Sequence, residues 1–244
     1  MQAENNKNDI RTLSFGCRLN SLESEKIQSM LAGVINTAIV VNTCAVTAEG
    51  ERQSGQAVRK IARENPNVPI FVTGCAATRN PALFSDIANA FVIPNADKMR
   101  LNAYTEALNR AQCTIVNPQI LQFNHSSSRL SKQFIQVQNG CNHKCTYCVT
   151  RLLRGPARSF EYAEILNDVR TAIRNGFTEI VLTGIDIASY ARDGLLISDI
   201  CRKLLQDEPG IMRLRLSSMD PASPEIFKIM DIMAADRRMM RHMH

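Results

Sequence analysis

The chain has 244 residues, of which 45% are hydrophobic and 21% are charged, a composition that excludes a disordered or collagen-like protein. Its 29 lysines and arginines exceed its 23 aspartates and glutamates by 29 − 23 = 6, so the net charge suits an anionic partner such as nucleic acid. No apolar run approaches the ~20 residues of a membrane helix, and residues 1–11 lack the apolar core of a signal peptide, so we expect a cytoplasmic protein with no membrane segment.

The first half of the chain alternates short apolar runs with helix signals. The runs are bounded by turn residues and predict buried strands at residues 12–16, 38–42, 69–74 and 90–93. Asn20 followed by Glu23 predicts a capping box at a helix start, and Asn80 before a proline predicts a second start. Asp97 predicts the start of a helix that reaches residue 110. This alternation is typical of a parallel sheet covered by helices, which we assign to a domain at residues 1–115.

A second alternation follows a polar segment at residues 116–132, which predicts a linker. Beyond it, apolar runs predict strands at 134–137, 179–183 and 212–217, and amphipathic segments predict helices at 160–175, 195–206 and 224–233. Three strand–helix units are too few to close a barrel. Residues 133–244 therefore predict either an open sheet or the first part of a barrel that continues in a longer protein, and we favour the second interpretation.

Three cysteines follow the first strand of this second region at CxxxCxxC spacing. They are Cys141, Cys145 and Cys148, termed the loop cysteines below. Thiolates at this spacing can point to one centre from a tight loop, and three of them on a cubane of four irons leave one iron open to a small molecule. A structural zinc site is the alternative, but its fourth ligand would have to be His143 or His125, neither at a familiar spacing. The spacing and the position after a strand favour an iron–sulfur cluster.

A second set of cysteines is spread along the first half of the chain. Cys17, Cys44 and Cys75, termed the sheet-edge cysteines, each stand directly after a predicted strand. Because the carboxyl ends of neighbouring parallel strands lie along one edge of a sheet, three thiolates there would converge on one centre. The alternative is three buried free cysteines; their equivalent positions favour a metal centre. Cys113 and Cys201 have no such partners, and we predict that they are packing residues.

These motifs together resemble a known family. Residues 16–21 (GCRLNS), 42–47 (NTCAVT), 72–75 (VTGC), 141–148 and 154–159 (RGPARS) are similar, in this order, to segments of the radical S-adenosylmethionine (SAM) methylthiotransferases. The resemblance implies an α/β fold, in which a flavodoxin-like parallel-sheet domain precedes an incomplete radical SAM β/α barrel. It also implies two [4Fe-4S] clusters, one on the loop cysteines and one on the sheet-edge cysteines, together with S-adenosyl-L-methionine.

The subgroup of highest similarity transfers a methylthio group to C2 of N6-threonylcarbamoyladenosine, next to the tRNA anticodon. In that chemistry the loop cluster binds SAM at its open iron and donates one electron, and SAM splits into methionine and a 5′-deoxyadenosyl radical. The second cluster holds the sulfur for transfer. The resemblance thus implies a tRNA substrate and an electron donor such as a flavodoxin or ferredoxin, and it identifies no catalytic side chain.

The resemblance also assigns three residues to SAM. Thr183 and Gly184 would contact its methionine end, and Tyr147 would lie near its adenine, where an aromatic ring can stack. The alternatives are a turn glycine at position 184 and, at position 147, a loop aromatic that covers the core.

Basic residues lie beside the loop cysteines. Arg151, Arg154 and Arg158 would either hold tRNA phosphates or form a solvated basic loop. Residues 151–153 (RLL) depart from the family, in which a Pro-Tyr stretch is common after the third cysteine.

Two other functions stay open. One is the same chemistry on a different substrate, either an aspartate of a ribosomal protein or isopentenyladenosine. The other is an inactive iron–sulfur-binding fragment, because the sequence stops inside the predicted barrel, before the later strands and the RNA-binding domain of the family.

Overall fold

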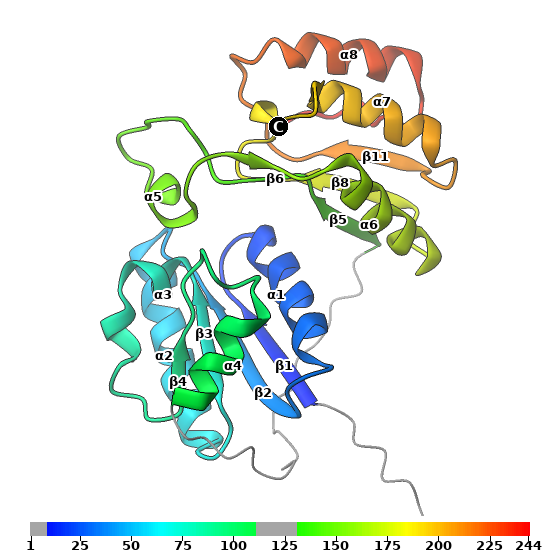
Figure 1. Ribbon diagram of the computed structural model, residues 1–244. Coiled ribbons are helices and arrows are strands. Elements are labelled where there is room, and N and C mark those ends of the chain that lie inside the picture. The colour runs from blue at the N-terminus through cyan, green and yellow to red at the C-terminus, as the bar shows by residue number, and fades with distance from the viewer. Residues whose placement is uncertain (1–8, 111–130) are drawn as a thin grey trace, which may run out of the picture. The chain divides into compact units, whose positions relative to one another are not determined.

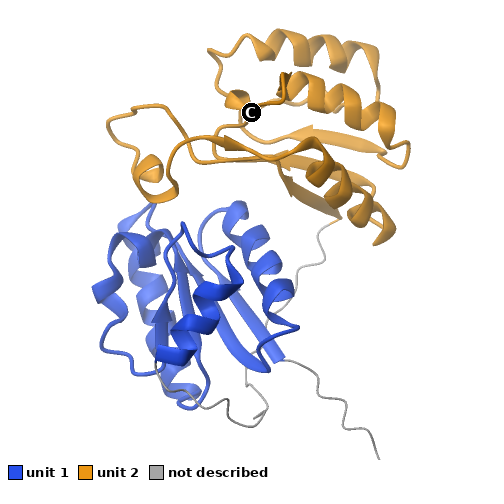
Figure 2. Cartoon of the chain, viewed as in Figure 1, with its two compact units in different colours: residues 1–126 blue, residues 127–244 orange. Residues whose placement is uncertain are grey.

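The computed structural model of the protein describes residues 9–110 and 131–244. The chain divides into two compact units, Met1–Ser126 and Ser127–His244 (Figure 2). This division falls within the segment that the sequence predicts to be a linker, at residues 116–132. Most of that segment lies outside the described residues, as do Cys113 and His125.

The first unit contains a sheet of four parallel strands in the order β1-β2-β3-β4. The strands are β1 (Asp9–Ser14), β2 (Thr37–Thr43), β3 (Ile70–Gly74) and β4 (Ala90–Val92). The helices are α1 (Arg18–Leu31), α2 (Ala48–Glu64), α3 (Cys75–Arg79), the 3-10 helix η1 (Pro81–Phe84) and α4 (Leu101–Arg110) (Figure 1). The predicted α/β class with a parallel sheet is confirmed. In flavodoxin itself the first strand is internal, so the likeness to flavodoxin lies in the layers and not in the strand order.

Apolar side chains on both faces of this sheet keep it between two layers of helices. Val40 and Phe71 belong to a core with residues of α1 and α4. Val41 and Val72 belong to a second core with residues of α2 and η1. Every residue of β2 and β3 is buried, as expected for parallel strands covered on both faces.

The first helix starts earlier than the sequence predicts. α1 begins at Arg18, with Cys17 at its N-cap and no side-chain cap. The capping box predicted at Asn20 and Glu23 is therefore wrong, because both residues lie inside the helix with about 1% of their surface exposed. Side chains that cap helices in solvent can equally satisfy buried polar groups, and that is what these two do.

Two later helix starts also differ from the prediction. Pro81 is the first residue of a helix, as predicted, but this helix is the short η1, and the side chain of Asn80 makes no cap hydrogen bond. The helix predicted from Asp97 begins at Leu101. It follows a turn in which the Arg100 amide donates to the Asp97 carbonyl at 2.8 Å.

The second unit contains a sheet of three parallel strands in the order β11-β8-β5. These are β5 (Lys132–Gln136), β8 (Glu179–Thr183) and β11 (Arg213–Leu216), and one face packs against α6 (Tyr162–Arg174), α7 (Ile197–Asp207) and α8 (Glu225–Ala235) (Figure 1). Shorter elements are β6 (Gln138–Asn139), α5 (Thr150–Arg154), β7 (Arg158–Ser159), η2 (Ile187–Ser189), β9 (Ala191–Arg192) and β10 (Leu195–Leu196). The three strands and three helices predicted for this region are confirmed.

A further parallel segment begins beside β11. The Leu214 amide donates to the Arg238 carbonyl at 2.8 Å, and the Met240 amide donates to the Leu214 carbonyl at 2.9 Å. Met239 pairs with Leu214 as an isolated parallel bridge. The unit therefore repeats strand and helix in the manner of a β/α barrel and reaches the position of a fourth strand, which agrees with the predicted incomplete barrel.

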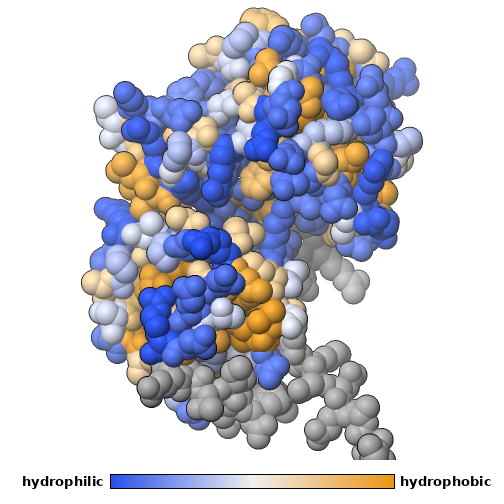
Figure 3. All heavy atoms as spheres, viewed as in Figure 1, coloured by the Kyte–Doolittle hydropathy of each residue, from blue (hydrophilic) through white to orange (hydrophobic). Residues whose placement is uncertain are grey.

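The surface is mainly polar on the side that Figure 3 shows, where hydrophilic residues surround smaller apolar patches. Among the described residues, no helix combines the length and the apolar character that crossing a membrane requires.

Candidate cofactor site

The sheet of the second unit has a polar face opposite its helices. Leu182 and Leu216 belong to the core with the helices, and side chains alternate along a strand, so Thr183 and Ser217 lie on the other face. Gln136 also lies there, at the end of β5. Gln136 Nε2 and Ser217 Oγ are buried and have no hydrogen-bond partner among the described residues. Such atoms are rare in folded proteins, and a polar molecule bound on this face would supply the missing partners.

The loop cysteines lie between β6 and α5. The antiparallel pairing of β6 with β7 closes the base of this loop, and the Cys141 amide donates to the Gly155 carbonyl at 3.2 Å. Gly140 has a φ of +70°, and a Cβ at this position would lie 2.0 Å from the Pro156 carbonyl oxygen. Any other residue at position 140 would clash with Pro156, so the backbone conformation at the start of the cysteine loop requires glycine there.

Cys148 has an environment that favours its thiolate. The hydroxyl of Thr150 and the backbone amides of Thr150 and Arg151 donate to its sulfur, and they lower the pKa of Cys148 although partial burial acts in the opposite direction. Hydrogen bonds to the charged form stabilise a thiolate. Metals bind the thiolate form of cysteine, so these hydrogen bonds favour metal binding by Cys148.

Cys141 has the opposite environment. Partial burial raises its pKa, and the negative charges of Asp186 and the other two loop cysteines raise it further. The His143 amide, whose nitrogen is 3.4 Å from Cys141 Sγ, partly offsets this. The site thus gathers several groups that are anionic when ionised, and a bound cation would relieve their repulsion.

His143 lies between two carboxylates. Its Nε2 is 3.2 Å from Asp186 Oδ2 and 3.4 Å from Asp220 Oδ2. Asp186 follows β8 and Asp220 follows β11, so the imidazole links the cysteine loop to the ends of two strands. In residues 9–110 and 131–244, Cys141, His143 and Asp186 form the one group of three His, Cys, Asp or Glu side chains whose ligand atoms all lie within 4.8 Å of one another.

Gln138 joins the cysteine loop to the loop that follows β8. Its Oε1 accepts from the amides of Ile185 at 3.0 Å and Asp186 at 2.8 Å. Its Nε2 donates to the carbonyls of Asn139 at 3.0 Å and Gly140 at 2.7 Å. The whole hydrogen-bonding capacity of the amide is used, and this one fully buried side chain fixes the spacing of the two loops.

The sheet-edge cysteines lie at the carboxyl ends of three neighbouring strands. Cys17 is exposed at the N-cap of α1, Cys44 is buried just after β2, and Cys75 is buried as the first residue of α3. The sulfur of Cys44 lies against the residue before Cys17, because a Cβ built on Gly16 would be 2.4 Å from it.

Buried polar side chains hold this edge of the sheet. Asn20 Nδ2 donates to the Thr43 carbonyl at 3.1 Å, and Asn42 Nδ2 donates to the Asn20 carbonyl at 3.0 Å. Gly74 has a φ of +96°, and a Cβ there would lie 2.3 Å from the Thr43 carbonyl oxygen. The turn that precedes Cys75 therefore depends on glycine.

A chain of polar contacts leads from a buried ion pair to Cys75. Lys98 Nζ is 2.5 Å from Glu23 Oε2 and 2.9 Å from Asn95 Oδ1. The other end of the Asn95 amide, Nδ2, is 3.8 Å from Cys75 Sγ. The Tyr104 hydroxyl donates to the Lys98 carbonyl at 2.7 Å and fixes the backbone of this turn.

The loop cysteines and the polar face of the second sheet offer donors that suit a [4Fe-4S] cluster and SAM. The loop cysteines supply three thiols and leave one iron of a cubane without a protein ligand. The unpaired polar atoms on the face of the second sheet suit the polar groups of SAM.

The residues predicted to contact SAM lie in different surroundings. Thr183 is buried at the end of β8, on the polar face. A Cβ on Gly184 would lie 2.8 Å from both the carbonyl and the side-chain oxygen of Gln138, so this glycine is needed for close packing. Tyr147 is 91% exposed. It covers no core, which excludes the packing alternative for this residue.

One of the three arginines beside the loop cysteines does not fit a phosphate contact. Arg154 is buried, with Nη1 3.4 Å from Asn139 Oδ1, so its assignment as a phosphate ligand is wrong. Arg151 and Arg158 are exposed and free of this constraint.

Cys201 lies on α7 and is fully buried in the core of the second unit, which confirms the prediction that it is a packing residue. Burial raises the pKa of its thiol to about 12.

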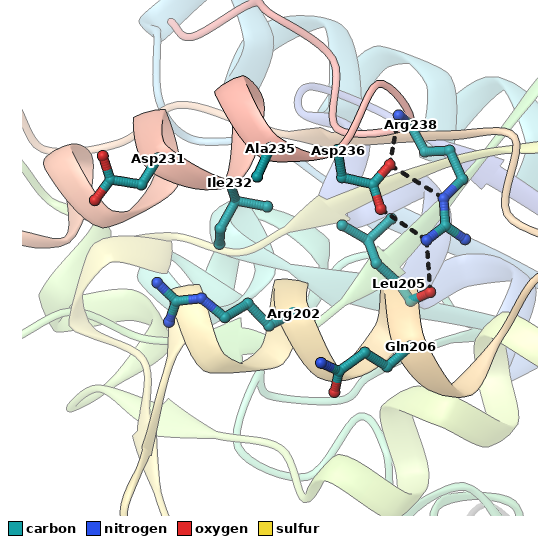
Figure 4. A pocket seen from close by; sticks show the side chains of 8 residues that line it. All are labelled: Arg202, Leu205, Gln206, Asp231, Ile232, Ala235, Asp236 and Arg238. Atoms are coloured by element: carbon teal, nitrogen blue, oxygen red, sulfur yellow. Dashed lines mark hydrogen bonds and ion pairs between the residues drawn. The ribbon is translucent and has the colours of Figure 1, made fainter.

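A groove of about 300 Å³ between α7 and α8 contains none of these residues. As Figure 4 shows, Arg238 pairs with Asp236 across its end and donates to the Leu205 carbonyl, at 2.7 Å in both contacts. A cation that satisfies the last carbonyls of a helix is a common way to end it. Arg238 therefore serves the end of α7.

Two family models match the chain. Residues 9–93 match the model described as "Uncharacterized protein family UPF0004", and residues 135–237 match the radical SAM superfamily. The first match contains the sheet-edge cysteines and the second contains the loop cysteines. The chain therefore has a radical SAM domain that follows a separate N-terminal domain.

Curated relatives make the family more specific. The chain is 35% identical, over 98% of its length, to the threonylcarbamoyladenosine tRNA methylthiotransferase MtaB of Rickettsia prowazekii, and 30% identical, over 96%, to the protein of the same name from Thermotoga maritima. It is 28% identical, over 85%, to the tRNA-2-methylthio-N(6)-dimethylallyladenosine synthase of Clostridium beijerinckii. The chain belongs to the radical SAM methylthiotransferase family. It spans 59%, 57% and 51% of the lengths of these three relatives.

A solved structure shares the fold. The radical SAM methyltransferase TsrM from Kitasatospora setae, determined with cobalamin and a [4Fe-4S] cluster, matches 94% of this chain and 59% of its own with a TM-score of 0.60 at 14% identity. At this identity the match supports the fold alone.

Proposed function

We propose that the chain is the cofactor-binding part of a tRNA methylthiotransferase that acts at C2 of N6-threonylcarbamoyladenosine, next to the anticodon. The observation that carries the proposal is the link from the cysteine loop to the polar end of the second sheet, through Gln138 and through the contact of His143 with Asp186. The names of the relatives support the choice of tRNA and of the modified base.

In this proposal the loop cysteines hold one [4Fe-4S] cluster with an iron open to SAM, and the sheet-edge cysteines hold a second cluster. When bound, these groups supply the reductive cleavage of SAM and the sulfur that replaces hydrogen at an unactivated carbon. An electron donor such as a flavodoxin or ferredoxin supplies the electron.

The chain's own residues bind and orient these groups. Gln138 holds the cysteine loop beside the loop after β8, where Thr183 and Gly184 contact the methionine end of SAM. Gln136 Nε2 and Ser217 Oγ, both without partners among the described residues, provide polar contacts on the same face.

Two kinds of exposed residue serve the remaining contacts. Tyr147, which is 91% exposed, provides a ring for the adenine of SAM. Arg151 and Arg158 are exposed beside the loop and provide positive charge for tRNA phosphates.

Iron content tests the two cluster sites. Anaerobic reconstitution with iron and sulfide should give about eight irons per chain, as two four-iron cubanes require. Replacement of all three sheet-edge cysteines by alanine should leave about four, whereas Cys201→Ala, which removes a core thiol, should leave eight. Full iron in the triple variant would refute the second cluster.

Product analysis tests the reaction. The reconstituted chain with dithionite should release 5′-deoxyadenosine from SAM, and Cys148→Ala should abolish this. Expression in a bacterial strain that lacks its own enzyme should restore the 2-methylthio form of N6-threonylcarbamoyladenosine in digested tRNA. Methylthiolation of isopentenyladenosine or of a ribosomal-protein aspartate instead would refute the substrate, and release of no 5′-deoxyadenosine would favour a non-catalytic scaffold.

A further inference from the structure

One loop cysteine has two neighbours that the iron–sulfur motif does not require. The ligand atoms of Cys141, His143 and Asp186 lie within 4.8 Å of one another. A tetrahedral ion with ligands at 2.0–2.3 Å holds its ligand atoms about 3.3–3.8 Å apart. His143 is half-exposed, with 50% of its side-chain surface accessible, so its ring can make the small adjustment that remains.

Asp186 provides an independent sign of a ligand. It is 8% exposed, and its Oδ2 has no hydrogen-bond partner among the described residues, although His143 Nε2 is 3.2 Å away. Its backbone amide is held by Gln138 at 2.8 Å. A buried carboxylate oxygen on a fixed backbone, whose ion-pair neighbour is a half-exposed imidazole, is a place where a cation would be stabilised.

The donor types select the class of ion. One thiolate, one imidazole and one carboxylate suit zinc, iron(II) or cobalt(II), whereas calcium and magnesium prefer oxygen ligands alone. Asp220 Oδ2 is 3.4 Å from His143 Nε2 and is available as a further ligand. The other two loop cysteines are outside this group of ligand atoms.

We propose that the cysteine loop without its cluster binds one divalent transition ion, zinc or iron(II), through Cys141, His143 and Asp186. The ion and a cubane would both need the sulfur of Cys141, so they exclude each other. The proposal does not depend on SAM chemistry or on the substrate.

Cobalt(II) is the probe, because thiolate-bound tetrahedral cobalt absorbs in the near ultraviolet and the visible. The full chain, freed of iron and with its sheet-edge cysteines replaced by alanine, is titrated anaerobically with cobalt(II). We expect one equivalent to bind, with the spectrum of a single thiolate ligand. His143→Ala should weaken binding by at least about 10-fold, the range seen when groups around a metal are removed, and Cys141→Ser should abolish the thiolate band.

Cys145→Ser and Cys148→Ser are the matched controls. Each removes a thiol from the same loop and should leave cobalt binding unchanged, whereas in the chain with its native sheet-edge cysteines each should reduce iron in the reconstituted loop cluster. His143→Ala should show the reverse pattern, weak cobalt binding with normal iron content. Because His143 is half-exposed, this variant does not disturb the core.

Two results would overturn the proposal. One is loss of cobalt in Cys145→Ser or Cys148→Ser together with retention in His143→Ala, since the ligands would then be the three thiolates of the motif. The other is no cobalt uptake by the parent chain. Neither result bears on the methylthiotransferase proposal, which is tested by iron content and product formation.

Discussion

Lys98 and Glu23 form an ion pair inside the first unit, with 2.5 Å between Nζ and Oε2 and about 1% of each side chain exposed. The pair connects α1 to the turn before α4, and through Asn95 it reaches the sulfur of Cys75. Two charges are removed from water together here, and each depends on the other.

Removal of one partner should therefore be costly. Lys98→Met should lower the free energy of unfolding by about 3–5 kcal/mol, because it leaves the Glu23 carboxylate buried without its cation. The measurement is urea unfolding followed by circular dichroism. Lys60→Met is the control, because Lys60 is 70% exposed and pairs with Glu64 at 3.8 Å, and it should change stability by less than about 0.5 kcal/mol. Equal effects of the two variants would contradict this account.

Gly74→Ala tests the turn that precedes Cys75. A φ of +96° strains any other residue, and the new Cβ would be 2.3 Å from the Thr43 carbonyl oxygen, so we expect a loss of about 2 kcal/mol or more in unfolding free energy. Gly33→Ala is the control, because nothing lies within 4 Å of its Cβ position and its φ is not positive. Thermal unfolding of the two variants side by side is sufficient. A melting temperature for Gly74→Ala equal to that of Gly33→Ala would refute the argument.

The sequence was informative about the strands because each is a short apolar run between turn residues. Placing cysteines after three such runs was enough to predict that they share one sheet edge, since parallel strands leave little freedom in where their ends lie. Helix starts were predicted less well. Asn20 and Glu23 have the pattern of a capping box, but they satisfy groups that are distant in sequence, the Thr43 carbonyl and the Lys98 ammonium. Local patterns contain no information about such partners.

The polar face of the second sheet was partly visible in the sequence. Gln136 and Gln138 alternate with the apolar residues Ile135 and Val137, and a period of two places both glutamines opposite the core. Their different roles were not visible, because Gln138 has four backbone partners whereas Gln136 Nε2 has none among the described residues. The approach of Asp220 to His143 joins residues far apart in sequence and required the folded chain.

Glu225 gives a prediction for acid pH. Burial raises its pKa, but the Lys228 ammonium at 2.8 Å and the Ser198 amide at 3.0 Å outweigh burial and hold the pKa below its ordinary 4.5. A lowered pKa in the folded state means that the carboxylate stabilises the fold above pH 4.5 and that this contribution is lost as the pH falls through the lower folded value.

Glu225→Gln should therefore melt at a lower temperature than the parent chain at pH 7, and the difference should shrink as the pH falls below 4.5. Calorimetry at several pH values measures it. Glu106→Gln, a change on α4 in the other unit, is the control and should show no such trend. A difference that grows on acidification would contradict the lowered pKa.

Gln138 provides the sharpest test of how the two cofactor loops are held together. Gln138→Glu keeps an acceptor for the Ile185 and Asp186 amides but loses the donor to the Asn139 and Gly140 carbonyls, which lie 3.0 and 2.7 Å from Nε2. We expect normal iron content, because no cysteine is changed, but a weaker effect of SAM on the electron paramagnetic resonance spectrum of the reduced loop cluster and at least about 10-fold weaker SAM binding, the scale set by one hydrogen bond to a buried group. Gln206→Glu is the matched control, because Gln206 is an exposed glutamine on α7 outside the cofactor site, and it should leave SAM binding unchanged. A full SAM-induced spectral change in Gln138→Glu would show that this side chain does not position the loops, whereas a loss of iron would show that it supports the cysteine loop alone.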